Sequence, residues 1–429
     1  MTKGIKRRDL LAGTAATLAM PALAQSKPDK LVYVGDNGPW HWVMVEEVGP
    51  AFEKATGIKI DFTLLPVDPW NARLKAELNS GSSGIDIVQW SVGMAGWLSP
   101  HFDDHEEYVA KIMARDPAWE WNDFLVGSKK AATYEGKLIG VPYRITTGIM
   151  HYQKYLMDAA GIAKLPETFE ELQKAAIALN KPPERYGFGI SGRQGPAILS
   201  SFYPWLYSAG GGMVDFKTGE ILINSPASIS GLEFWVDLIT KYKVVPPEAL
   251  TWEYEEIVAG GQSDRYAMVQ TFAPYGTLIN DPKISKSGGK WTWSTVPGKT
   301  EKSQSRTWVD GHSLGIPKYT KNKEWSLEFI RLCCDKKWMR RSMERGNAPP
   351  RGSVLRDPEM IEKIGWPEVA AKAIETGIPT PAQPVFPTLA LSLRAGLSQA
   401  VLGQKTAKQA LDDVATDWQR GLRRGGIIK

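Results

Sequence analysis

Residues 51–62 read Ala-Phe-Glu-Lys-Ala-Thr-Gly-Ile-Lys-Ile-Asp-Phe and decide the fold class, because they join a helix directly to a strand. In the segment 43–56, apolar residues recur three and four positions apart, the spacing of a half-buried helix. Gly57 follows as a C-terminal cap, and residues 58–62 then alternate between apolar and polar side chains as a strand does. We therefore expect a helix-to-strand unit here.

Strand and helix patterns alternate on both sides of this unit. Residues 31–34 form a short β-rich run before Gly35, and residues 85–88 form another. Between the second and third strands, Asp68 and Pro69 open a helix as its N-cap and first-turn proline. This β-α-β-α-β order predicts an α/β fold, in which ligands bind at the carboxyl ends of the strands.

The first 24 residues have the composition of an export signal. Arg7 and Arg8 stand in a basic segment, a short apolar run follows, and Ala22-Leu23-Ala24 has the small-x-small pattern of a cleavage site. The two arginines followed by Asp-Leu-Leu are typical of a twin-arginine signal. An ordinary Sec signal is the alternative, and both place the mature chain outside the cytoplasm. We expect a periplasmic protein, cleaved after Ala24.

Charge and length narrow the class of protein further. The 429 residues carry a formal net charge of +5; the first 24 hold four bases and one acid, which leaves +2 on the remaining 405. This small charge does not favour nucleic acid or an anionic membrane as partner. Beyond residue 24 no apolar run reaches about 18 residues, so we expect no membrane-spanning helix.

The length of the chain predicts two domains. The adjacent Cys333 and Cys334 are expected to be buried thiols.

Patterns that would indicate an enzyme or a cofactor are weak. Residues 187–192 match G-x-G-x-x-G, but the sequence after them predicts a strand running into a loop rather than a helix start. His101 and His105 are four residues apart, which a solvated helix start explains better than a metal site. There is no G-x-S-x-G nucleophile elbow. We expect no cofactor, no metal and no catalytic residue, although a hydrolytic pair of carboxylates cannot be recognised from spacing alone.

Seventeen tryptophans are the most informative compositional feature. Their flat apolar rings suit the C–H faces of sugars. Those inside amphipathic helices, such as Trp235 and Trp418, are expected to pack in a core, whereas others fall at a strand end or a helix start, where an α/β sheet binds its ligand. With the polar residues beside them, the latter give the candidate set Trp40, Trp70, Trp90 and Trp308 with Asp36, Asn37, Asp68, Ser91, Asp310 and His312.

Several stretches occur in the order found in a known family. They are residues 51–60, Gly84-Ile85-Asp86-Ile87-Val88-Gln89-Trp90, residues 136–143, Pro166-Glu167-Thr168-Phe169-Glu170-Glu171-Leu172 and residues 310–317. On these stretches the chain resembles the extracellular solute-binding proteins of family 1, the sugar-binding subunits of ABC importers. The resemblance extends over nearly the whole mature chain.

The resemblance implies a two-lobed periplasmic-binding-protein fold of type II. Each lobe would be a mixed sheet flanked by helices, and hinge crossovers would join the lobes around a ligand cleft. The first lobe would hold residues 25–142 plus 313–333, the second lobe 146–307 plus 338–429, and the hinges would lie near 142–146, 307–313 and 333–338.

The resemblance also assigns roles to single residues. Asp36 and Asn37 match the polar pair that follows the family's first strand. Trp90 and Tyr275 match aromatic residues that contact sugar. Trp205 stands where the cleft would receive a further aromatic ring.

Two departures from the family pattern favour a small ligand. Thr146 stands where the family has an acid at the first crossover, and Ala390 replaces a stacking tryptophan. Arginines are further candidates for contact with the solute, because guanidinium groups bind vicinal hydroxyls but equally suit carboxylate and phosphate groups. The arginine candidates are Arg144 at the crossover and Arg193 and Arg351 in predicted loops.

We therefore expect a non-catalytic, monomeric binding protein for a carbohydrate-like solute. The solute would be a mono- or short oligosaccharide, a polyol or a sugar acid, delivered to the permease of an ABC importer. The alternatives are a binding protein for a phosphodiester, a polyamine or another non-sugar solute, an exported carbohydrate-active hydrolase or lyase, and a twin-arginine oxidoreductase.

Overall fold

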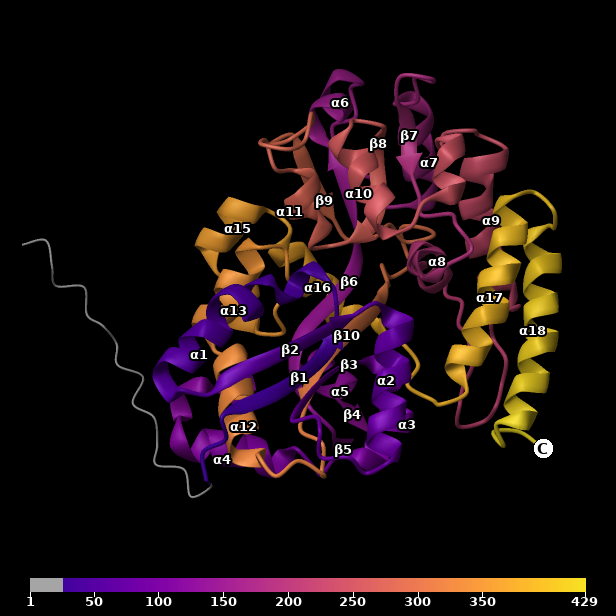
Figure 1. Cartoon of the computed structure of the whole chain (residues 1–429). Helices are drawn as coiled ribbons and strands as arrows, with labels where there is room; N and C mark the ends of the chain where they lie inside the picture. The colour runs from indigo at the N-terminus through magenta and orange to yellow at the C-terminus, as the bar shows by residue number, and fades with distance from the viewer. Residues whose placement is uncertain (1–25) are drawn as a thin grey trace, which may run out of the picture.

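One mixed sheet extends through the whole molecule. The computed structural model describes residues 26–429, so the expected export signal lies outside the described residues. The strand order is β2-β1-β3-β10-β6-β8-β7, with β9 beside β6 and β11 beside β10 (Figure 1). The strands are β1 Lys30–Asp36, β2 Lys59–Leu65, β3 Ile87–Ser91, β6 Val141–Gln153, β7 Tyr186–Gly189, β8 Tyr266–Phe272, β9 Trp291–Ser294, β10 Trp308–Gly315 and β11 Ile378–Pro379, while β4 Thr133–Tyr134 and β5 Lys137–Leu138 form a separate pair.

The opening of the chain folds as its periodicity predicts. β1 pairs in parallel with both β2 and β3, and α1 Gly49–Thr56 and α2 Val67–Asn79 connect them. Gly57 closes α1 with a φ of 71°, a left-handed conformation that glycine adopts without strain. The helix before it is less regular than expected, because residues Met44–Val48 form a turn of π-helix.

Buried apolar side chains form two separate cores, and the elements that carry them lie in opposite halves of the molecule (Figure 1). The helices that follow α2 are α3 Ala95–Leu98, α4 Glu106–Arg115, α5 Val126–Ala131, α6 Lys154–Ala159, α7 Phe169–Ala178, α8 Pro196–Ser208, α9 Pro226–Thr240, α10 Tyr254–Gln262, α11 Tyr275–Ile279, α12 Lys323–Cys333, α13 Lys336–Glu344, α14 Gly352–Leu355, α15 Pro358–Ile364, α16 Pro367–Thr376, α17 Phe386–Val401 and α18 Ala407–Arg424. The first core, which defines the first lobe, lies around β1, β3, α1, α2 and α12. The second core, which defines the second lobe, lies around β7, β8, α8, α9, α17 and α18.

Two long strands pass from one core to the other. On β6, Ile145 and Ile149 belong to the first core, and Met150 begins the part in the second core. On β10, Trp308 packs in the second core and Val309 in the first. The crossovers on β6 and β10 therefore lie side by side, as an antiparallel pair in the middle of the sheet.

The third connection lies elsewhere than at the expected residues 333–338. Buried residues from Met339 to Ile374, on α13–α16, belong to the first core, although we expected them in the second lobe. Their apolar faces pack there because α16 lies against β6. The chain returns to the second lobe after α16 through β11, which pairs in parallel with the start of β10 at Trp308 and Ile378.

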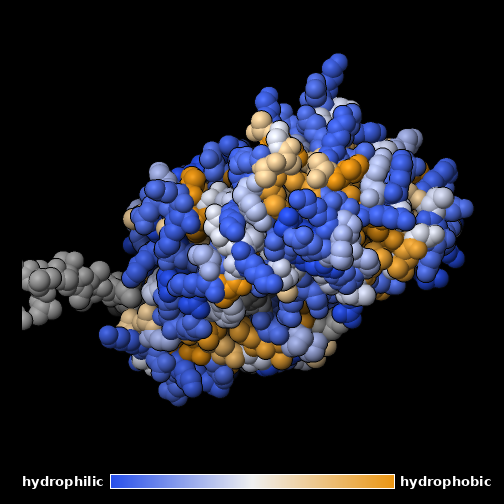
Figure 2. All heavy atoms as spheres, turned by 90° about the horizontal axis from the view of Figure 1, so that it is seen from above, coloured by the Kyte–Doolittle hydropathy of each residue, from blue (hydrophilic) through white to orange (hydrophobic). Residues whose placement is uncertain are grey.

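The described residues include no helix that is long and apolar enough to cross a membrane. Seen from above in Figure 2, the surface is mostly hydrophilic, and its apolar groups form separate patches. Cys333 and Cys334 are both buried free thiols, as expected from their position in an apolar helix.

Candidate functional site

The paired crossovers of β6 and β10 have one apolar face and one polar face. Successive side chains of a strand point to opposite sides of the sheet. On one side, Ile145 and Val309 pack in the first core behind α16. On the other side, the register places Arg144 opposite His312 and Thr146 opposite Asp310. We call these four side chains the crossover floor: Arg144, Thr146, Asp310 and His312.

Three of the four floor side chains are buried with a polar atom that has no hydrogen-bond partner among the described residues, whereas Asp310 Oδ1 accepts from the Gly311 amide at 2.7 Å. Arg144 is 5% exposed, Thr146 3% and His312 8%. Among residues 26–429, no hydrogen-bond partner faces Arg144 Nε, Thr146 Oγ1 or His312 Nδ1. Such groups lose their hydration and regain nothing on folding, which costs about 1–3 kcal/mol each. Three such groups therefore share one face of the paired crossovers.

Trp40 supports Arg144 from the first lobe. The Arg144 guanidinium lies 3.9 Å from the centre of the Trp40 ring, in a cation–π arrangement. Trp40 Nε1 donates to Asp36 Oδ1 at 2.9 Å, and Tyr143 Oη donates to the Trp40 carbonyl at 2.8 Å. His312 packs edge-on against the same indole, with ring centres 5.5 Å apart. Trp40 thus contacts the crossover floor through Arg144 and His312, and its stacking on a sugar stays a prediction.

Burial decides the protonation of this group of residues. It raises the pKa of Asp36 to about 6, against the opposing hydrogen bond from Trp40 and the charge of Arg144. Burial also raises the pKa of Asp310, although the backbone of Gly311 and the charge of Arg144 oppose it. It lowers the pKa of His312 well below its usual range, so this imidazole is neutral at pH 7.

A second polar group lies on the second-lobe side of the crossover floor. Gln270, on β8, is 4% exposed, and neither its Nε2 nor its Oε1 has a partner among the described residues. It occupies the space beside Gly148, where an added Cβ would lie 2.2 Å from Gln270 Nε2. Thr307 Oγ1, also unpaired in this part of the chain, borders the same space at 3.2 Å from that Cβ position. Sequence reasoning missed Gln270, and a glycine inside a strand was the only signal of such a close approach.

Tyr275 and a cluster of charged groups belong to the same side. Burial raises the pKa of Tyr275 to about 12, opposed by the charge of Arg144, so its hydroxyl stays protonated. Burial likewise raises the pKa of Glu253, opposed by the Ala197 amide, which donates to Glu253 Oε2 at 3.2 Å, and by the charges of Arg193 and Arg394. Arg394 Nε has no partner among the described residues. Arg394 was also missed, although it follows Ala390 by one helical turn on α17.

The structure places the other tryptophan candidates in the cores. Trp90 and Trp205 are fully buried and Trp70 is 2% exposed, so all three rings pack in the cores, although no hydrogen-bond partner among the described residues faces their indole Nε1 atoms. Trp308 is 4% exposed, with its Nε1 donating to the Ser200 carbonyl at 3.1 Å and its ring edge-on to Phe272. It borders Gln270 and Gly148 without offering a free face.

The small polar candidates are spread around the first lobe. Ser91 pairs with His312 across β3 and β10 and is half-buried, so it borders the crossover floor. Asn37 is exposed directly after β1, and its backbone N–H donates to the Leu65 carbonyl at 3.0 Å. Asp68 was expected to be the N-cap of α2, but the helix begins at Val67 with Pro66 as its N-cap, so Asp68 lies in the first turn; its side chain is outside the described part.

Arg351 lies apart from the crossover floor and is bound by other groups of the protein. It is 0% exposed, and its guanidinium donates to the carbonyls of Cys334, Glu120 and Trp119 at 2.8, 3.2 and 2.7 Å. It also forms an ion pair with Asp123 at 3.1 Å. Four of the five N–H donors of Arg351 are thus used to tie two loops of the first lobe together.

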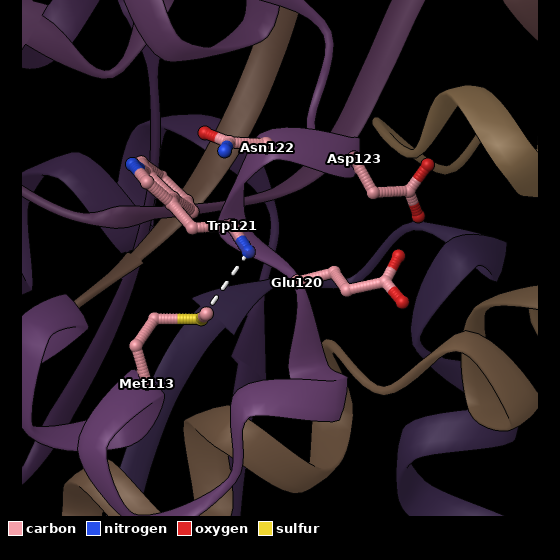
Figure 3. Close-up of a pocket in the computed structure, with 5 residues that line it drawn as sticks. All are labelled: Met113, Glu120, Trp121, Asn122 and Asp123. Carbon is pink, nitrogen blue, oxygen red and sulfur yellow. Dashed lines mark hydrogen bonds between the residues drawn. The ribbon is translucent and has the colours of Figure 1, made fainter.

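A concave surface of about 640 Å³ lies near these loops, lined by Met113, Glu120, Trp121, Asn122 and Asp123. In Figure 3, the carboxylates of Glu120 and Asp123 point to one side and the Trp121 ring to the other, and the Trp121 amide donates to Met113 Sδ at 3.3 Å. Asp123 is already bound by Arg351 and Ser353. This surface therefore lacks the unpaired buried groups of the crossover floor.

His101 and His105 have structural partners. His105 Nε2 accepts from the Ile316 amide at 2.9 Å, and His101 Nδ1 lies 3.1 Å from the Tyr319 hydroxyl. Within the part of the chain that the structure describes, no three His, Cys, Asp or Glu residues are placed to hold a metal ion.

Comparisons with known proteins agree with this architecture. Residues 43–339 match the family model described as bacterial extracellular solute-binding protein. The chain is 24% identical over 327 residues to an erythritol/L-threitol-binding protein of Mycolicibacterium smegmatis, covering 71% of this chain and 67% of that protein. It is 23% identical over 359 residues to a probable ABC transporter-binding protein of Deinococcus radiodurans, covering 81% and 82%.

Solved structures show the same fold. The maltose-bound MalE3 of T. maritima superposes with a TM-score of 0.80 at 22% identity, covering 91% of this chain and 99% of the other. A solute-binding protein from Agrobacterium radiobacter in complex with ribitol also gives 0.80, at 23% identity, covering 92% and 100%. The type II two-lobed fold expected from the sequence is thereby confirmed.

Proposed function

Because the chain belongs to the bacterial extracellular solute-binding proteins, a family that places it in the periplasm or outside the cell, we propose that it captures a small sugar or polyol for an ABC importer. The solute would lie on the crossover floor between the two lobes, and the loaded protein would deliver it to the permease subunits. The relatives and structural neighbours that are described as binding erythritol, ribitol or maltose support this class of solute.

The observation that carries the proposal is the one-sided polarity of the crossover. Hydroxyl groups both donate and accept, so a polyhydroxylated solute can satisfy Arg144 Nε, Thr146 Oγ1 and both ends of the Gln270 amide at once. Tyr275 adds a half-buried ring with a protonated hydroxyl. With Ala390 where a larger aromatic would extend the site, we expect one ring or one open chain rather than a long oligosaccharide.

Capture of the solute would be coupled to closure of the lobes. Arg144 is supported by Trp40 from the first lobe, whereas Gln270 lies on β8 in the second. A solute bound to both would stabilise one angle between the lobes, and only a ligand that favours one state can shift the equilibrium. The permease could then distinguish loaded from empty protein.

Thermal denaturation of the purified mature protein tests the proposal. Erythritol, ribitol, mannitol, tagatose and maltose are compared with a glycerophosphodiester and with spermidine. A solute at 100 times its dissociation constant should stabilise the native state by about 2.7 kcal/mol. The proposal fails if the sugars and polyols leave the melting temperature unchanged while a phosphodiester or spermidine raises it.

Thr146→Val is the matched test of the floor. It removes one buried unpaired hydroxyl at nearly constant volume, so the ligand-free protein should unfold at the same or a higher temperature. The stabilisation by solute should nevertheless shrink. Thr240→Val, at an exposed helix end in the second lobe, is the control that should change neither quantity.

We further infer a monomeric binder without catalytic activity, exported by the twin-arginine route and cleaved after Ala24. The family and its structural neighbours are binding proteins, which supports the first inference. A bound sugar should be recovered chemically unchanged after long incubation. Mass spectrometry of the secreted chain gives its first residue, and replacement of Arg7 and Arg8 by lysine should stop export if the route is the twin-arginine one.

A further inference from the structure

The Trp40 indole has groups of the protein on three sides. The Arg144 guanidinium covers the ring, 3.9 Å from its centre, and His312 packs edge-on with the ring centres 5.5 Å apart. On the third side the indole fills the place of a missing side chain, since a Cβ added to Gly38 would lie 1.9 Å from Trp40 Cζ2. Trp40 Nε1 also donates to Asp36 Oδ1 at 2.9 Å. The position of this ring is therefore determined by the protein itself.

The loop that carries Trp40 is fixed by hydrogen bonds of its own. Tyr143 Oη donates to the Trp40 carbonyl at 2.8 Å. Burial lowers the pKa of the neighbouring His41 to about 3, so this imidazole is neutral at pH 7. The Gly38 carbonyl, 3.3 Å from His41 Nδ1, can only accept, so Nδ1 carries the proton and Nε2 accepts from Tyr33 Oη at 2.9 Å. The indole is thus presented from a rigid support.

Arg144 has no comparable support from polar groups. It is 5% exposed, and within residues 26–429 it forms no ion pair and its Nε has no hydrogen-bond partner. A guanidinium is planar and stacks on aromatic faces, which leaves its N–H donors free at its edges. An ion pair would occupy some of these donors, whereas the Trp40 ring occupies none.

We propose that Trp40 is a positioning residue, whose indole holds the Arg144 guanidinium in the orientation that binds the solute. Trp40 contributes to affinity through Arg144 and does not stack on the solute itself. A long side chain that is already oriented loses less conformational entropy when the solute binds. The inference rests on the proposed function, since it specifies how that site holds its solute.

A double-mutant cycle tests whether the two residues act as one unit. The affinities of wild type, Trp40→Leu, Arg144→Met and the double variant are measured by calorimetry with ribitol, mannitol and maltose. For weak variants, the affinity is obtained from the rise of the melting temperature with solute concentration. We expect Trp40→Leu to lower the affinity about tenfold in the wild-type background, and less than about twofold in the Arg144→Met background. A ring that stacked on the solute would cost the same factor in both backgrounds.

Two milder variants perturb the support while the protein keeps its fold. Gly38→Ala removes no atom of Trp40, but the new Cβ must push the indole away from its place, so we expect an affinity about threefold lower or less. This loss should disappear in the Arg144→Met background. Gly93→Ala, with nothing within 4 Å of its Cβ, is the matched control and should bind as the wild type does. Trp40→Phe keeps an aromatic face for the guanidinium and should restore most of the affinity that Trp40→Leu loses.

The outcomes distinguish this role from the function on which it rests. If Trp40→Leu lowers affinity equally with and without Arg144, the ring contacts the solute; the positioning role is then refuted, while the proposed function stands. It is also refuted if Arg144→Met binds as tightly as the wild type, or if both Trp40→Leu and Gly38→Ala do. If the wild type binds a glycerophosphodiester or spermidine and none of the sugars and polyols, the proposed function fails and this inference fails with it.

Discussion

Replacing Asp36 by asparagine should stabilise the ligand-free protein at neutral and alkaline pH. Asp36 ends β1 as a buried carboxylate, held by Trp40 Nε1 at 2.9 Å and placed 3.6 Å from the neutral imidazole of His41. Burial opposes its ionisation, so the native state carries an unfavourable charge that the unfolded chain does not. Asparagine keeps the acceptor for Trp40 and removes the charge.

The size of this effect follows from the pKa of Asp36. That pKa rises from 3.8 to about 6 on folding. Two pKa units correspond to about 3 kcal/mol of native-state destabilisation, fully present above pH 6 and lost as the pH falls toward 4. The sign is the reverse of a salt-bridged acid: the native state binds the proton more tightly, so protonation favours folding. The gain from Asp36→Asn should thus be about 3 kcal/mol at pH 8 and well under 1 kcal/mol at pH 4.

Urea denaturation of wild type and variant, without solute, at pH 8 and pH 4 measures the effect. The difference between the two free energies of unfolding at each pH removes the contributions of the other titrating groups, which both proteins share. Asp61→Asn is a control of opposite sign, because the hydrogen bond and charge of Lys30 lower the pKa of that exposed acid; it should bring no gain at pH 8. The reasoning is refuted if Asp36→Asn is destabilising at pH 8, or if its gain is the same at both values of pH.

Two further substitutions test separate parts of the structure. Gly148→Ala should displace the Gln270 side-chain amide, because the new Cβ would lie 2.2 Å from Nε2, and calorimetry should show a solute affinity at least tenfold lower. Gly93→Ala, with nothing within 4 Å of its Cβ, is the control and should leave the affinity unchanged. If Gly148→Ala binds solute as tightly as the wild type, Gln270 does not belong to the site. Arg351→Met should lower the free energy of unfolding by about 3–5 kcal/mol, because it leaves Asp123 and three carbonyls without their partner. The folded fraction should still bind solute with wild-type affinity, and a loss of affinity there would place Arg351 in the site after all.

Local patterns predicted the parts of the fold that local physics determines. The helix-to-strand unit around residues 51–62 forms with its glycine cap in place. The division of the chain between the lobes was less accessible, since α13–α16 are amphipathic helices that either core could bury. The choice of the first core depends on α16 lying against β6, a contact between segments more than 200 residues apart. Periodicity carries no information about such a contact.

The structure brings together the candidates chosen by their position in the fold more than those chosen as tryptophans, and their role in binding stays a prediction. Asp36, Arg144, Thr146, Asp310 and His312 were singled out as strand-end or crossover residues, and the structure brings them together. Reasoning from the chemistry of tryptophan was less successful, because a ring at a strand end can turn inward, as Trp90 does near the end of β3, and because Trp205 is buried within α8. Gln270 was missed because it matters only through its place beside Gly148, which has no side chain to fill that space. The register in which β8 pairs with β6 puts the two residues together, and the sequence does not reveal that register.

The location of the crossover floor gives binding a direct influence on lobe angle. Its residues lie on β6 and β10, the same strands that pass between the two cores, so the proposed hinge and the proposed binding surface share these strands. β11 joins β10 at Trp308, which adds a third strand at the same level. Bending at this level would change the spacing between Arg144, held by Trp40 of the first lobe, and Gln270 of the second. A solute that spans both must therefore discriminate between hinge angles, and its affinity should rise when the lobes are locked closed. If locking them closed left affinity unchanged, the solute would be held by one lobe alone.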